Sequence, residues 1–139
     1  MDRALFLKER DEAIAAGERA LVSLKRAQSE LSGARTWGAI DMLGGSFFSS
    51  LIKRSKMKNA QTCLQQASND LAAFSRELGD VNRFSYINVD VGDLLGLADL
   101  FYENFLVDLL MQNRINTARG KVSDAISKVQ GAVDQLKRM

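Results

Sequence analysis

Any catalytic chemistry in this 139-residue chain must use carboxylates, lysine or tyrosine, because it contains no histidine and a single cysteine, Cys63. Without histidine, the chain lacks the side chain that titrates near neutral pH and the commonest protein ligand of transition metals. Ser-His-Asp and Cys-His nucleophilic sites are therefore excluded within one chain. One cysteine cannot supply the thiolates of a usual zinc site. We predict no catalytic activity and no bound cofactor.

Three acids in the second half of the chain, Asp99, Glu103 and Asp108, raise the question of an acid–base or metal site. Asp99 and Glu103 are four residues apart, so they share one face of a helix. Asp108 follows Asp99 by nine residues, which turns it to the opposite face of a continuous helix. A di-metal carboxylate bundle usually has Glu-x-x-His pairs, which this chain lacks. The spacing therefore favours solvated or paired carboxylates, with a metal or ligand site as the alternative.

The stretch TWGAIDMLGGSFFSS, residues 36–50, is the part of the chain least typical of a helix. Its glycines allow backbone angles that other residues resist. We expect the tryptophan to pack as an apolar plug over the end of a helical bundle, and the aspartate to cap free N–H groups of the turn. The alternative is a loop that binds a partner or ligand. The residues of this predicted motif are Trp37, Gly38, Asp41, Gly44 and Gly45.

The same stretch reads W-G-x-x-D-x-x-G-G and resembles a group of small bacterial all-helical proteins that have no assigned activity. Two later stretches are similar to that group, namely L-x-x-F-x-x-E-L at residues 71–78 and A-D-x-F with a following aromatic residue at 98–102. The resemblance implies a helical fold, and it favours a polar cluster or a ligand or metal site at Asp41, Asp99 and Asp108. Glu103 stands where the pattern has an aspartate, which argues against a strict metal site.

The elements that must position these residues are helices. No proline interrupts the chain, which favours long helices, and apolar residues recur at helical and heptad spacing. We predict helices at residues 2–33, 46–79, 91–103 and 104–138. The predicted fold is all-α and a single domain over residues 1–139. It is an elongated antiparallel helical bundle of three long helices plus one short helix, with coiled-coil-like packing.

The apolar spacing also predicts which residues face the bundle core. In the first helix one seam line is Leu7, Ile14, Leu21 and Gln28, the other is Arg10, Gly17, Leu24 and Leu31, and Ala13, Ala20 and Ala27 line a flank. In the second the seam is Ala60, Leu64, Ala67, Leu71, Phe74 and Leu78, and in the last it is Ala118, Val122, Ala125, Val129, Ala132 and Leu136. We expect Gly79 to end the second helix and Asp90 to cap the third. Tyr86 and Tyr102 are assigned packing roles.

Arg10 and Asp108 both fall on predicted seam positions. A carboxylate on a seam needs a partner, and these two residues can meet near one end of the bundle if the first and last helices run parallel. We predict an Arg10–Asp108 pair that fixes the helix register.

The basic run Lys53, Arg54, Lys56 and Lys58 lies beside apolar residues at the start of the second predicted helix. Such a helix can lie on a membrane surface. Nucleic acid is not an expected partner, because no aromatic interleaving or glycine-rich phosphate loop accompanies the run. No stretch approaches about 18 consecutive apolar residues, so we predict no membrane span.

These patterns favour a non-catalytic, cytoplasmic protein that acts through protein–protein contact and self-associates as a homo-oligomer. A long, thin bundle leaves apolar surface that association can cover, and the single cysteine and absence of an N-terminal signal suit the cytoplasm. One alternative is a ligand- or metal-binding protein using Asp41, Asp99 and Asp108. The other is a peripheral membrane protein using the basic start of the second helix.

Overall fold

The computed structural model describes residues 3–32, 47–102 and 115–139, and these residues form four helices and no strand. The helices are α1 (Arg3–Ser32), α3 (Phe47–Asn82), α4 (Val91–Tyr102) and α6 (Ile115–Arg138). The predicted all-α class is confirmed, with three long helices and a short one among the described residues.

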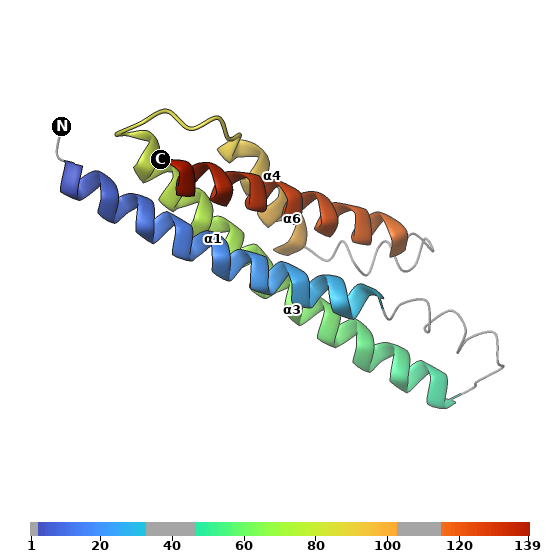
Figure 1. Ribbon diagram of the computed structural model, residues 1–139. Helices are drawn as coiled ribbons and strands as arrows, with labels where there is room; N and C mark the ends of the chain where they lie inside the picture. The colour runs from blue at the N-terminus through green and yellow to red at the C-terminus, as the bar shows by residue number, and fades with distance from the viewer. Residues whose placement is uncertain (1–2, 33–46, 103–114) are drawn as a thin grey trace.

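The three long helices lie side by side along the molecule, and the shorter α4 packs on their middle (Figure 1). Helix α1 packs on α3 and α6, and α4 packs on α3 and, less extensively, on α6. The order around the bundle is therefore α1, α3, α4, α6, which places α4 diagonally opposite α1. Successive described helices alternate in direction, as in an up-down-up-down bundle.

Helices α1 and α6 run antiparallel, with both chain ends at one end of the bundle (Figure 1). Near the start of α6, Arg119 Nε donates a hydrogen bond to the carbonyl oxygen of Leu31 at 2.9 Å, which satisfies a carbonyl in the last turn of α1. Near the other end of α6, Lys137 forms an ion pair with Glu18 at 3.2 Å. These two contacts fix the relative direction of the helices.

The antiparallel arrangement corrects the premise of the predicted Arg10–Asp108 pair, which required the first and last helices to run parallel. The Arg10 guanidinium pairs instead with the neighbouring carboxylate of Asp11 at 3.1 Å. Asp108 lies outside the described residues, so the pair itself stays a prediction, now without the arrangement that favoured it.

The core is a continuous cluster of apolar side chains from all four helices. The predicted seam residues of α3 and α6 are buried, and α4 adds Leu94, Leu97, Ala98 and Phe101. In α1 the predicted seam residues Gly17, Leu21, Leu24 and Leu31 are buried, whereas Ile14 and Gln28 are only half-buried. The alanines predicted for a flank, Ala13, Ala20 and Ala27, are fully buried as well. Small side chains on α1 let the neighbouring helices approach closely, so that the flank joins the core.

Helix α3 continues past Gly79, where the sequence predicted its end, to Asn82. The extra turn carries Val81 into the core, and burial of a valine outweighs the roughly 1 kcal/mol cost of a helical glycine. The chain then turns, and the Asn82 carboxamide oxygen accepts a hydrogen bond from the Ile87 N–H at 3.1 Å. Asp90 caps α4 as predicted, because its carboxylate accepts the Asp93 N–H at 3.0 Å.

Candidate functional site

Three carboxylates meet between α1 and α3, where the sequence did not predict a site. Glu9 and Glu12 from α1 and Glu77 from α3 each offer a carboxylate oxygen, and these oxygens lie within 4.8 Å of one another. Glu77 is half-buried, and its Oε2 atom is buried without a hydrogen-bond partner. Burial, followed by repulsion from Glu12, Asp80 and Glu9, raises the pKa of the Glu77 carboxyl, and Arg19 partly offsets this.

This acidic cluster can hold a shared proton or a hard cation such as Ca²⁺ or Mg²⁺, whose preferred ligands are carboxylate oxygens. Its members are only partly buried or exposed, and acids on a protein surface commonly lie this close without an ion. We therefore interpret the cluster first as three carboxylates that repel one another, with a repulsion that the other contacts of the fold outweigh.

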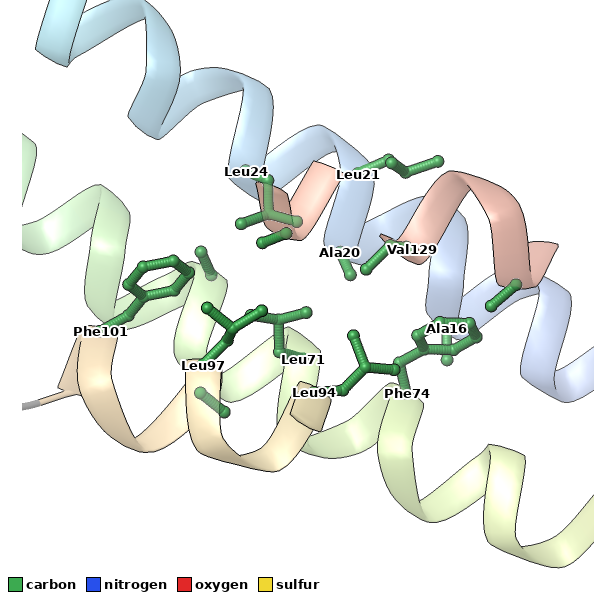
Figure 2. Close-up of a cluster of buried hydrophobic side chains, with 14 of the residues drawn as sticks. Ala16, Ala20, Leu21, Leu24, Leu71, Phe74, Leu94, Leu97, Phe101 and Val129 are labelled. Carbon is green, nitrogen blue, oxygen red and sulfur yellow. The ribbon is translucent and has the colours of Figure 1, made fainter. Parts of the chain in front are cut away.

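Helix α4 is held at three points on its neighbours. Its buried side chains Leu94, Leu97 and Phe101 point toward the core residues of α1, α3 and α6 (Figure 2). The buried Ser68 hydroxyl on α3 donates a hydrogen bond to the carbonyl oxygen of Ala98 at 2.5 Å. Asp93, in the first turn of α4, forms an ion pair with Lys128 of α6.

Lys128 is the main polar link between α4 and α6. It also pairs with Asp124, one turn earlier on α6, at 3.1 Å. Hydrogen bonds to Asp93 and then to Asp124 raise the pKa of the lysine, so Lys128 stays charged throughout the physiological range. Both acids are about half exposed, and this limits what the pairs contribute to stability.

A groove of about 360 Å³ remains between α4 and α6 beside this ion pair. Val89, Asp93 and Leu94 line one wall, and Lys128, Gly131 and Ala132 line the other. A Cβ atom added at Gly131 would have no neighbour within 4 Å. The α4–α6 edge is therefore the loosely packed side of the bundle.

The outward face of α4 carries two exposed large side chains. Leu95 is 41% exposed and Tyr102 is 64% exposed. Gly92, Gly96 and Asp99 lie on the same face at helical spacing, and all three are exposed. This set of five residues, Gly92, Leu95, Gly96, Asp99 and Tyr102, is called the α4 outer face below.

The assignment of Tyr86 and Tyr102 to packing roles is wrong. Tyr86 is 78% exposed in the loop after α3, and Tyr102 is 64% exposed at the end of α4. Phe101, the residue before Tyr102, takes the inward position and is fully buried. Helical geometry then turns Tyr102 by about 100° away from the core.

The acids predicted as a ligand or metal site are not brought together within the described residues. Asp99 is exposed on the α4 outer face, and Asp41 and Asp108 lie outside the described residues. The other members of the interhelical motif, Trp37, Gly38, Gly44 and Gly45, also lie outside them. The acidic-site alternative stays a prediction.

The predicted basic patch lies at the start of α3. Lys53, Arg54 and Lys56 belong to its first turns, although the structure describes their backbone only, and Lys58 is exposed. No helix within the described ranges is long and apolar enough to cross a membrane.

Sequence spacing predicts only part of the carboxylate cluster and does not predict the ion pair between α4 and α6. Glu9 and Glu12 are three residues apart and so share a helix face, but Glu77 joins them only through the register of α3 against α1. Likewise, the sequence separation of Asp93 and Lys128 does not predict their ion pair, because this contact depends on the packing of α4 beside α6. Cys63 is half-buried, and burial raises the pKa of its thiol.

Comparison of the chain with protein-family models, with curated proteins and with solved structures finds no match.

Proposed function

We propose that this protein is a non-catalytic helical bundle that acts through protein–protein contact and self-associates. The observation that carries the proposal is the α4 outer face, where Leu95 and Tyr102 are 41% and 64% exposed on a helix whose other side is buried in the core. Apolar side chains gathered on one outward face favour a partner, because association removes them from water.

The composition supports contact rather than catalysis, because the chain has no histidine to act as a base near neutral pH. The acid on the α4 outer face, Asp99, is exposed to solvent, and water screens its charge. We place the activity in the cytoplasm as part of the same proposal, since a single cysteine suits a reducing compartment.

The test is the molar mass in solution of the wild-type protein and of a Leu95→Ser, Tyr102→Ser double variant, measured by light scattering after gel filtration. We expect the wild type to associate and the double variant to be monomeric at the same concentration. Because both side chains are exposed, the variant should keep its helix content and most of its stability.

Val22→Ser is the matched control. Val22 is 52% exposed on α1, diagonally opposite α4, so its loss should leave the molar mass of the assembly unchanged. A wild type that stays monomeric at high concentration would contradict the proposal. Equal association of the wild type and the double variant would show that the contact lies on a surface other than α4.

A further inference from the structure

The end of the bundle where α1 begins and α6 ends (Figure 1) carries an aromatic pocket of about 360 Å³. The rings of Phe6 on α1 and Phe84 in the turn after α3 meet edge to face, with their centroids 6.5 Å apart, and both side chains are half-buried. Met139, Ser85 and Arg3 complete the lining. Ligand pockets typically measure roughly 300–1,000 Å³ and combine apolar walls with a few polar groups, so this pocket suits a small molecule with an apolar body.

The polar groups of this end pocket are hydrogen-bond donors that are not yet in use. The structure gives Arg3, which is exposed, no ion pair with any described acid, and it gives the Ser85 hydroxyl no hydrogen bond to another described residue. No acidic side chain is among the residues that line the pocket. A guanidinium beside a hydroxyl, both at the edge of an apolar pocket, favours a ligand with a negatively charged oxygen group.

The charges around the end pocket are also mainly basic. Arg83 and Arg138 each directly precede a lining residue, and both are exposed. The described acids begin about one helical turn farther back, with Glu9 on α1 and Asp80 on α3. Asp2, the one acid within two residues of a lining residue in the sequence, lies outside the described residues. A negative group that enters the pocket therefore meets bases before it meets these described acids.

From this lining and charge we infer that the end pocket binds a small amphipathic anion. The apolar body of the ligand packs against the two phenylalanine rings and Met139, and its carboxylate or phosphate head binds Arg3. A guanidinium forms paired hydrogen bonds with the oxygens of either group, and the Ser85 hydroxyl supplies a further donor. The end pocket is separate from the α4 outer face, which lies on the middle of the bundle (Figure 1), so the inference does not depend on the proposed self-association.

The groove between α4 and α6 has a similar volume but a different chemistry. Its base, Lys128, is already held by Asp93 and Asp124, so an anion bound there must compete with two carboxylates. Arg3 in the end pocket has no such competitor among the described residues. This difference is the reason to place the anion at the end of the bundle.

The test is a titration with four probes of matched chemistry, namely octanoate, 1-octanol, octylammonium and acetate, each below any micellar concentration. The first three share the apolar body and differ in the charge of the head, and acetate has the head without the body. We expect octanoate to bind more tightly than the other three. The ε-methyl resonance of Met139 in the NMR spectrum locates the binding, since Met139 lines the pocket, and the variant Met139→Leu assigns that resonance.

The variant Arg3→Met removes the charge and keeps a side chain of similar length. It should weaken octanoate binding by roughly tenfold or more, because the head loses its charged hydrogen bonds, and it should leave 1-octanol binding unchanged. The matched control is Arg76→Met, which removes an exposed base of α3 outside the pocket and changes the net charge equally. This control should bind octanoate as the wild type does, and circular dichroism should show wild-type helix content for both variants.

Several outcomes would overturn the inference. Equal affinities for octanoate and 1-octanol would mean that the head is not recognised, and a Met139 resonance that octanoate does not shift would place any binding elsewhere. Octanoate binding that Arg3→Met leaves unchanged, or that Arg76→Met weakens as much, would remove the role of Arg3. None of these results alters the molar mass of the ligand-free protein, so the proposed self-association is tested separately.

Discussion

The junction of α1, α3 and α6 differs sharply from the α4–α6 edge in how closely its helices pack. At Gly17 of α1, an added Cβ would lie 2.9 Å from Phe74 Cε1 of α3 and would also collide with Val133 of α6. At Gly120 and Gly131 of α6, an added Cβ would meet no atom within 4 Å. The three long helices therefore form the structural core. Helix α4 is fixed mainly to α3 and leaves its outer face exposed.

This contrast separates two roles within one small protein. The tight junction holds most of the fully buried side chains of the long helices, so mutations there should cost stability. The edge and the α4 outer face hold exposed apolar residues and a half-exposed ion pair, so mutations there should change association more than folding.

The largest effect is expected from Phe74→Ala. Phe74 is fully buried and lies against α1 and α4 (Figure 2), so its truncation leaves a cavity at the tight junction. The expected loss is about 3–5 kcal/mol in the free energy of unfolding, measured by urea denaturation followed by circular dichroism. A loss below about 1 kcal/mol would show that the junction collapses around the cavity, contrary to the tight packing of the three long helices.

A smaller loss is expected from Gly17→Ala. Alanine favours a helix over glycine by about 1 kcal/mol, but the added methyl group must displace Phe74 and Val133. Overpacking of this kind costs about 1–3 kcal/mol, so the net change should be destabilising. Thermal unfolding by circular dichroism measures it, and a higher melting temperature would contradict the tight packing.

The opposite sign is expected at the open side of α6. In Gly120→Ala the new methyl group meets nothing, and the helix gains the propensity of alanine. The protein should therefore become more stable by up to about 1 kcal/mol. Gly17→Ala and Gly120→Ala form a matched pair, because the same chemical change should move the melting temperature in opposite directions.

The smallest effect is expected from Glu77→Gln, which removes one charge from the acidic cluster. The raised pKa means that the folded state binds this proton more tightly than the unfolded state. The carboxylate is thus destabilising at neutral pH, and this effect disappears as the pH falls through the raised pKa toward 4.5, the ordinary value. Glu77→Gln should stabilise the protein by less than about 1 kcal/mol at pH 7.

The pH dependence provides the check on this variant. The difference in melting temperature between Glu77→Gln and the wild type should shrink as the pH is lowered from 7 to about 4, since protonated Glu77 resembles glutamine. A difference that stays constant over this range would mean that the gain comes from packing and not from the charge.

The sequence predicted the helices well where one apolar periodicity dominates. The seam of α3 from Ala60 to Leu78 and the seam of α6 from Ala118 to Leu136 are buried as expected. The predicted end at Gly79 was wrong because a tertiary contact, the burial of Val81, overrides the local preference of a glycine.

The sites were harder to predict than the helices, because they depend on how helices lie against one another. The meeting of Glu77 with Glu9 and Glu12 follows from the register of α3 on α1, which heptad spacing does not specify. The direction of α6 relative to α1 follows from the number and order of the helices. Tyr102 was assigned to packing because aromatic residues are often buried, and its neighbour Phe101 occupies that place.

The central claim is that the bundle self-associates through a contact centred on α4. Sedimentation equilibrium of the wild-type protein over a range of about 1–100 µM tests it most directly. We expect the mass to rise above the 15.4 kDa of one chain as the concentration increases. A mass that stays at that of one chain throughout the range would contradict the claim.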